Sequence, residues 1–394
     1  MKIIKLIIIL LVYKSAFGQN NSIISGTTKQ IKFGKVYIVG IGTSKKYYGK
    51  NSFLDSAEIS NGKFKIKKKI FDNEIRAYRF VFRSQKINGV TDFVFIDKKD
   101  IVVIIDSIDL YRAPLIKSSM IQNEMRFNYN SFFKNFVVQI KHQTDFEDSL
   151  NLIYIDNFPD SIKFKLNFLR NKILLESDSL IYSYSKNHPN SYVTLWKLIE
   201  RFYELGYNDV YLKVFNLLNI KIRSSSLGKL FYSDLKKSEI LKLERLFPQL
   251  SVKNIYGSKH IFKPLSSKYD FTLIDFWFSN CSPCLKDFPS YKRIYKSYHK
   301  EGFEVIGLSV DKEINVANWK KTIKNRQLPW PQFLDPNGYV SSGYNINSFP
   351  TNFLLNKQGK IIRINISSIE LEDLLKENLI KNDINDNIPK LEPD

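Results

Sequence analysis

The feature that most constrains the fold is an apolar run that leads directly into two closely spaced cysteines. Residues 271–278, FTLIDFWF, have the β-branched and aromatic composition of a buried strand. Cys281 and Cys284 follow as a Cys-x-x-Cys pair, and apolar residues then recur at helical spacing from Pro283 to Tyr298. The sequence therefore predicts a strand, a short turn and a helix that begins at the cysteines.

The segments after this helix alternate between strand and helix patterns. EVIGLSV, TNFLL and KIIRINI are expected strands, and helices are expected around Ala317 to Lys324 and Leu371 to Leu379. Such alternation is typical of an α/β layer, in which helices cover the faces of a sheet. We therefore expect an α/β domain over residues 251–381, with a linker in its polar first part, 251–268, and a polar tail over 382–394.

Two regions of different composition precede this domain. Residues 19–115 contain short β-branched and aromatic segments, and the pairs Asn61-Gly62 and Asn88-Gly89 are expected to form tight turns. These features predict an antiparallel, β-sandwich-like N-terminal domain. Residues 116–250 carry apolar residues at helical spacing, with prolines between the segments, and predict a helical middle region of about four to six helices.

The N-terminus has the composition of a secretory signal peptide. Lys2 and Lys5 precede the apolar run LIIILLVY, and Ala16-Phe17-Gly18 provides small residues for cleavage before Gln19. The run is far shorter than the roughly 20 residues that span a bilayer. We therefore expect residues 1–18 to be a signal peptide that exports the protein from the cytoplasm. An uncleaved N-terminal anchor is the alternative.

The charge of the chain is strongly positive, with 60 Lys and Arg against 39 Asp and Glu and a formal net charge of +21. Such a charge favours polyanionic partners when it is gathered in one patch. Here the lysines are spread along the chain without an arginine-rich stripe or a nucleic-acid-binding motif. We therefore expect no nucleic-acid partner.

The two cysteines are the only ones in the chain. A disulfide between residues this close closes a very small loop, so it constrains the unfolded chain little and suits reactivity better than stapling. Cys281 is expected at the start of a helix, where free N–H groups and the helix dipole stabilise a thiolate. Cys284 lies one turn further in and is expected to be more shielded. These positions point to thiol–disulfide exchange, with Cys281 attacking a partner disulfide and Cys284 resolving the mixed disulfide.

Four other residues fit the same chemistry. Asp275 lies inside the apolar run, where a buried carboxylate has a raised pKa and can accept the proton of Cys284; a surface Asp at a strand end is the alternative. Pro283 fits the first helical turn, whereas Pro289 lies inside the helix. Pro350 precedes an apolar strand and is a candidate for a cis peptide bond.

Other cysteine chemistries fit the sequence less well. A structural zinc site needs about four ligands, and His260 and His299 have no metal-ligand spacing. Haem attachment requires a His directly after the second cysteine, where this chain has Leu285. A peroxiredoxin would not need the second thiol three residues on. We therefore expect neither a metal nor a cofactor.

The chemistry-bearing residues together resemble a known family. Asp275, Trp277, the Cys281/Cys284 pair, Pro289 and Phe349-Pro350 reproduce the order and spacing of the thioredoxin-fold pattern. EVIGLSVD, LPWPQFLD and YNINSFPTNFLLNKQGKII resemble the TlpA/ResA-type branch of exported thiol–disulfide oxidoreductases, over about residues 250–381. More weakly, NSFLDSAEISNGKFKIKKKI resembles an N-terminal β domain of uncharacterised function that precedes such modules in some Gram-negative envelope proteins. This resemblance implies that the chain reaches the periplasm or cell envelope.

The resemblance implies roles and partners for this chain. It implies that the backbone around cis Pro350 pairs with the substrate, that disulfide- or dithiol-bearing envelope proteins are the substrates, and that a membrane thiol donor keeps the enzyme acting as a reductant. The Cys-x-x-Cys pair alone is also compatible with an oxidase or an isomerase. Asn280 replaces the usual Trp, Ser282-Pro283 replaces Gly-Pro, and Phe349 is bulkier than usual. These departures bear on redox potential and on the choice of partner. The alternative function is an envelope binding or assembly protein that uses this domain as a scaffold.

Overall fold

The computed structural model describes residues 21–41, 45–49, 54–69, 74–85, 87–97, 100–105, 113–117, 119–154, 158–263 and 268–379. The expected signal peptide, 1–18, and the expected tail, 382–394, lie outside these ranges. The chain forms two compact units, one of Met1–Glu204 with Lys213–Lys229 and one of Leu205–Leu212 with Leu230–Asp394. No helix among the described residues is long and apolar enough to cross a membrane.

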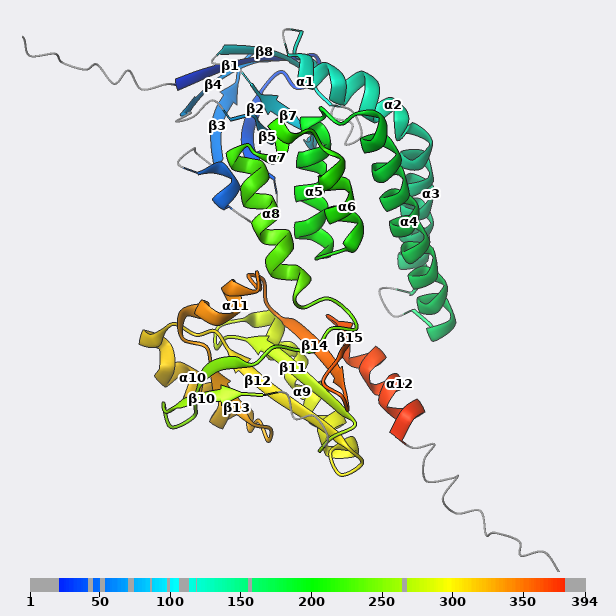
Figure 1. Cartoon of the computed structure of the whole chain (residues 1–394). Coiled ribbons are helices and arrows are strands. Elements are labelled where there is room, and N and C mark those ends of the chain that lie inside the picture. Colours follow the sequence, from blue (N-terminus) through cyan, green and yellow to red (C-terminus); the bar gives the residue numbers. More distant parts are fainter. Residues whose placement is uncertain are drawn as a thin grey trace, which may run out of the picture. The chain divides into compact units, whose positions relative to one another are not determined.

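The first unit contains two sheets, as its β-branched segments predict (Figure 1). One sheet has the strand order β4-β1-β8, from Lys63–Lys69, Asn21–Thr28 and Asp100–Ile105. The other has the order β3-β2-β5-β6, from Leu54–Ile59, Gly34–Gly40, Arg76–Arg83 and Asn88–Val90, with β7 (Val94–Ile96) also paired to β5. Among the strand pairs described in this unit, β8 and β1 depart from the predicted antiparallel arrangement: they run parallel, which the long connection between them permits.

The two Asn-Gly pairs of this unit have different outcomes. Asn61 and Gly62 both have positive φ, 49° and 73°, in the turn that joins β3 to β4, which confirms the predicted tight turn. The prediction for Asn88-Gly89 is wrong, because both residues lie in strand β6 opposite Arg83 and Phe82. The chain turns just before them, where the Ser84 hydroxyl accepts the Ile87 N–H and donates to the Ile87 carbonyl.

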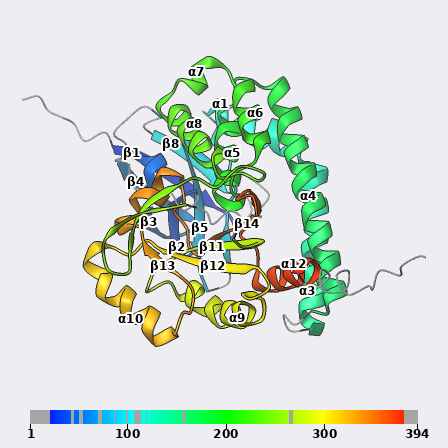
Figure 2. The same cartoon turned by 60° about the horizontal axis from the view of Figure 1, so that its bottom comes forward.

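The helical middle region is also present. Its helical segments are α1 (Met120–Asn123), a π-helical segment η2 (Glu124–Tyr129), α2 (Asn130–Phe132), α3 (Lys134–Tyr154), α4 (Asp160–Asn187), α5 (Tyr192–Leu205), α6 (Asp209–Leu217), α7 (Ile220–Arg223) and α8 (Ser226–Glu239). The long helices α3 and α4 run side by side in both views (Figures 1 and 2). Helix α5 packs against the β-rich part, where Trp196 contacts Tyr48 and donates its indole N–H to the Ile75 carbonyl at 3.0 Å.

The second unit is built on a sheet with the order β10-β9-β13-β12-β11-β14-β15. Its strands are β9 (Leu250–Asn254), β10 (Lys259–Phe262), β11 (Phe271–Trp277), β12 (Phe303–Ser309), β13 (Gln332–Leu334), β14 (Thr351–Asn356) and β15 (Ile361–Ile364). Its helices are α9 (Ser282–Tyr298), α10 (Val316–Arg326), α11 (Tyr339–Gly343) and α12 (Ser368–Leu379), with short 3-10 turns at Glu313–Asn315 and Pro336–Gly338. Strands β11, β12 and β13 are parallel, whereas β14 runs antiparallel to β11.

The expected linker at 251–268 is wrong over its first part, because β9 and β10 form an antiparallel hairpin at the edge of this sheet. Asn254 closes the turn by accepting the N–H groups of Tyr256 and Ser258, and Gly257 supplies a positive φ of 87°. The strands look polar in sequence because they are short and because β9 buries only Leu250 and Val252.

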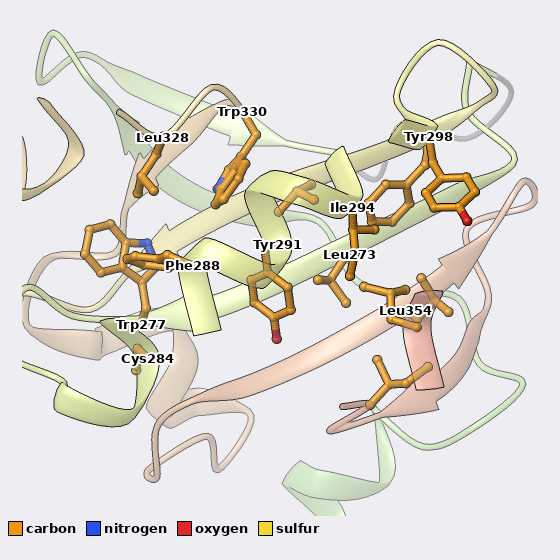
Figure 3. Packing of buried hydrophobic residues seen from close by; sticks show 14 of the residues in the cluster. Leu273, Trp277, Cys284, Phe288, Tyr291, Ile294, Tyr298, Leu328, Trp330 and Leu354 are labelled. Carbon is orange, nitrogen blue, oxygen red and sulfur yellow. The ribbon is translucent and has the colours of Figure 1, made fainter. Parts of the chain in front are cut away.

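Strand β11 is apolar except at Thr272 and Asp275, because both of its faces are buried. Ile274 and Phe276 point into one core, whereas Leu273 and Trp277 point into the other. The second core also contains residues of α9, such as Phe288 and Ile294, and of α12 (Figure 3). Figure 3 shows Trp277 and Cys284 together at one end of this core. Side chains alternate between the two faces of a strand, so Asp275 lies on the same face as Leu273 and Trp277, which is covered by α9.

Candidate functional site

The two cysteines lie where β11 ends and α9 begins, and they form a disulfide with a Cα–Cα distance of 5.3 Å. Cys281 is the N-cap of α9, and its Sγ accepts the backbone N–H of Cys284 at 3.2 Å. Pro283 lies in the first turn, where its missing N–H costs no helical hydrogen bond. The helix therefore directs one of its free N–H groups at the sulfur of Cys281, which favours negative charge on that sulfur.

Exposure does not distinguish the two cysteines in this disulfide form. Cys281 is 2% exposed and Cys284 is 1% exposed, although Asn280, Ser282 and Pro283 around them are exposed. The difference between the sulfurs comes instead from their positions. The sulfur of Cys281 caps the helix, whereas Cys284 lies one turn further along α9 and donates its backbone N–H to that sulfur. Both cysteines belong to the core that contains Trp277 and Phe288.

Asp275 is a buried carboxyl in the middle of β11, with only 1% of its surface exposed. It is paired with Gly307 on β12 and Asn352 on β14, so it is not a surface residue at a strand end. Its Oδ1 has no hydrogen-bond partner among the described residues. Burial, and then the charge of Asp287, raise the pKa of Asp275 to about 7. A carboxyl with that pKa can take up or release a proton near neutral pH.

Asp287 and Tyr291 belong to the same site, although neither was among the residues predicted from the sequence. Burial raises the pKa of the Asp287 carboxyl. Burial, followed by the charges of Asp275 and Asp287, raises the pKa of Tyr291, whose hydroxyl accepts an N–H of Asn352 at 3.2 Å. With Cys284, these two residues are spaced three and then four apart on α9, which places them on one helix face. That spacing was a signal that the sequence contained.

Phe349 and Pro350 lie next to the cysteine-bearing loop. The peptide bond between them is cis, and Thr351, the first residue of β14, pairs with Phe276. The rings of Phe349 and Phe278 meet edge to face with centroids 5.7 Å apart. The antiparallel pairing of β14 with β11 thus brings this proline-bearing turn to the end of the strand that delivers Cys281.

Trp277 and Pro289, which the sequence predicted as supporting residues of the site, lie in β11 and α9. Trp277 is fully buried, donates its indole N–H to Gln332 at 3.2 Å and packs edge to face on Phe288 with centroids 5.1 Å apart. Pro289 is exposed and lies inside α9. Trp277 therefore fixes the end of β11 against the first turns of α9.

A hydrogen-bonded carboxylate that sequence reasoning missed holds the loop before Cys281. Asp311, which is 3% exposed, accepts the backbone N–H and the hydroxyl of Ser279 at 2.8 and 2.7 Å. It also accepts the hydroxyl of Ser309 at 2.8 Å. Asp311 thus ties the loop that leads to Cys281 to the end of the neighbouring strand β12.

This geometry predicts a stability effect. Replacing Asp311 by Ala leaves three buried donors unpaired, so we expect the second unit to lose about 3 kcal/mol of unfolding free energy. Guanidinium unfolding followed by tryptophan fluorescence measures the loss. Asp270→Ala is the control, since it removes only an exposed ion pair with Lys357 and should cost less than about 1 kcal/mol. Equal losses in the two variants would contradict an anchoring role for Asp311.

No group of three or more His, Cys, Asp or Glu side chains within the described part of the chain is placed to hold a metal ion. His260 stacks on Phe333, and the Nδ1 atom of His299 lies 3.0 Å from the Phe303 carbonyl oxygen. Both histidines therefore have contacts that do not involve a metal.

A mixed sheet with a parallel centre, an antiparallel strand that begins after a cis proline, and a helix that starts at a Cys-x-x-Cys pair together define a thioredoxin-like domain. Residues 243–364 match the model of the AhpC/TSA family. The thiol-disulfide oxidoreductase ResA of Bacillus cereus (strain ATCC 10987 / NRS 248) is 29% identical over 170 residues, which are 43% of this chain and 95% of that protein. ResA of a second Bacillus cereus strain is 32% identical over 133 residues, 34% of this chain and 72% of that protein. The chain belongs to this family of thiol–disulfide oxidoreductases.

Solved structures of proteins with the same description are also similar to the chain. The thioredoxin domain of a thiol-disulfide oxidoreductase from Bacteroides vulgatus has 26% identity and a TM-score of 0.32, over 35% of this chain and 99% of that one. A thiol-disulfide oxidoreductase from Bacteroides fragilis NCTC 9343 has 32% identity and a TM-score of 0.30, over 34% of this chain and 98% of that one.

Proposed function

We propose that this enzyme is exported and exchanges disulfides with envelope proteins through Cys281 and Cys284, acting as a reductant. The observation that carries the proposal is the capped helix start, where the sulfur of Cys281 accepts a helix N–H, together with the buried Asp275 carboxyl, whose Oδ1 has no hydrogen-bond partner among the described residues. The first feature favours a thiolate, and the second provides a nearby group that can accept a proton.

The reaction proceeds in two exchanges. In the dithiol enzyme, the Cys281 thiolate attacks one sulfur of a substrate disulfide; the substrate S–S bond breaks, a mixed disulfide forms, and the released substrate thiolate takes a proton from solvent. Cys284 then loses its proton to Asp275 and attacks the sulfur of Cys281. This step closes the Cys281–Cys284 disulfide and releases the second substrate thiolate, so two electrons pass to the substrate. A dithiol donor at the membrane must then reduce the enzyme.

The surroundings of the pair supply three supporting roles in this proposal. Pro350 presents the backbone beside which the substrate chain lies, and Phe349 shapes the rim of that surface. Trp277 and Pro289 are positioning residues that hold β11 and α9.

The signal peptide at 1–18 delivers the chain to the envelope, and the domain boundaries 19–115, 116–250 and 251–381 belong to the same proposal.

The direction of electron flow is tested by the reduction potential of the Cys281–Cys284 couple, measured by equilibration of the full mature chain with glutathione. We expect a value near that of thioredoxin, about −270 mV, as suits a reductant. A value near that of DsbA, about −120 mV, would overturn the assignment as a reductant, because about 30 mV shifts this equilibrium tenfold.

A further inference from the structure

The rim of the candidate site has a concentration of unpaired positive charge. A depression of about 520 Å³ lies next to Cys281, between the start of α9 and the end of α10. Asn280 and Ser282, which flank Cys281, form one side of it, and Leu285, Lys286, Pro289 and Arg326 form the rest of its wall with Ser279. The wall contains two cations and no carboxylate.

These cations are free to meet a partner. Within the described part of the chain, neither Lys286 nor Arg326 forms an ion pair, and both are exposed. Arg293, on the same helix as Lys286, is by contrast paired with Glu372. The adjacent acid, Asp287, is half-buried and interacts with Asp275 rather than lining the depression.

The fold holds the two cations beside each other. Lys286 is on the second turn of α9, and Arg326 is the last residue of α10. The side chain of Lys292 donates to the Arg326 carbonyl oxygen at 3.0 Å, which ties the end of α10 to α9 and adds a third cation nearby. The ends of two helices therefore place these cations on the same depression beside Cys281.

We propose that this depression binds a carboxylate-bearing segment next to the reacting cysteine, so that the enzyme prefers protein disulfides flanked by Asp or Glu. The inference rests on the proposed exchange through Cys281 and identifies its substrate class. Positive charge at a rim acts mainly on the rate of encounter, and its effect falls with ionic strength. Carboxylates of the substrate would meet Lys286 and Arg326 while its disulfide approaches Cys281.

The test uses three disulfide peptides that differ only in the residues flanking their cysteines, which are Asp, Ser or Lys. The reduced full chain is mixed with each peptide, and kcat/KM is measured with dithiothreitol as the regenerating dithiol. At low ionic strength we expect the Asp peptide to react about ten times faster than the Ser peptide, and the Lys peptide to react more slowly than both. The preference should shrink toward unity as salt is added.

Two double variants test whether Lys286 and Arg326 cause the preference for the Asp peptide. In Lys286→Gln with Arg326→Gln, the ratio of the Asp to the Ser peptide should fall to about two-fold or less. The matched control, Lys296→Gln with Lys320→Gln, removes the same charge from the same two helices outside the depression and should keep the wild-type ratio. Equal ratios in the two double variants would overturn the proposed site.

The two proposals fail in different ways. If the wild-type chain reduces all three peptides at equal rates at low salt, the acidic preference is wrong and the exchange function stands. If adding the chain does not raise the rate for any peptide above that with dithiothreitol alone, both the exchange function and the preference are wrong. The salt dependence of the wild-type chain needs no variant, so the test does not depend on how the substitutions affect folding.

Discussion

The variant Cys281→Ser is expected to lose disulfide exchange down to the uncatalysed rate, a fall of roughly a thousand-fold or more, because it removes the nucleophile on which both exchanges depend. Insulin reduction in the presence of dithiothreitol measures the loss. Ser297→Ala, an exposed position near the far end of α9, is the control and should retain wild-type activity. A wild-type chain that itself shows no exchange would favour the alternative function, a binding or assembly protein with a scaffold domain.

The companion variant Cys284→Ser tests the division of roles. It keeps the attacking thiol but lacks the group that resolves the mixed disulfide. We expect turnover to stop after one exchange and a covalent adduct with the substrate to accumulate, visible by mass spectrometry and removed by dithiothreitol. If Cys281→Ser forms the stable adduct instead, the assignment of nucleophile and resolving thiol must be reversed.

The second large effect is expected at Asp275. In Asp275→Asn the proton acceptor is lost, and we expect resolution of the mixed disulfide to slow by about a hundred-fold near pH 8. In the wild-type chain the resolution rate should rise with pH through the pKa of about 7, as the carboxyl becomes able to accept a proton. Rapid-quench measurement of the adduct gives this profile. A variant that retains the inflection near pH 7 would contradict the role of Asp275.

The same substitution should stabilise the protein in a pH-dependent way. Because folding raises the pKa of Asp275 from its ordinary value of 3.8 to about 7, the folded state holds this proton more tightly than the unfolded state does. The carboxyl therefore costs no stability below its unfolded pKa, and its cost grows as the pH rises toward its folded pKa. Relative to wild type, we expect Asp275→Asn to gain about 4 kcal/mol of unfolding free energy between pH 4 and pH 8.

Guanidinium unfolding of the oxidised full chain at both pH values measures this gain. Three of the four tryptophans, Trp277, Trp319 and Trp330, are buried in the core above Asp275, so fluorescence mainly reports the relevant unit. The change with pH is the informative quantity, since the cost of burying an unpaired amide does not vary over this range. A stability difference that is constant with pH would show that the carboxyl does not titrate as proposed.

Much of the candidate site follows from local sequence pattern. A doubly buried strand must be apolar along its length, so Asp275 stands out within FTLIDFWF. The Cys-x-x-Cys pair, the proline between its cysteines and the helical spacing that follows are sufficient to predict where α9 begins. The turn at Asn61-Gly62 followed from the positive φ that only a few residue types adopt without strain.

Local pattern failed where long-range pairing decides the outcome. Asn88-Gly89 has turn composition, yet it lies in β6 because Arg83 and Phe82 provide strand partners. The polar segment at 251–263 looks like a linker, yet β9 joins the sheet edge through Phe333 and Leu334 of β13. In both cases strand pairing fixes the conformation, and the composition of the segment alone does not reveal its partners.

By itself, the sequence determined the closely spaced pair of cysteines, the strand and helix that carry it, and the buried acid in that strand, because each is encoded by residues close together in the chain. Only the tertiary structure decided what surrounds the pair. The sheet register places Asn352 and Pro350 beside β11, the end of β12 brings Asp311 to Ser279, and the end of α10 brings Arg326 to Lys286. These contacts join residues that are tens of positions apart, and packing of the sheet and its helices is the physical cause that brings them together.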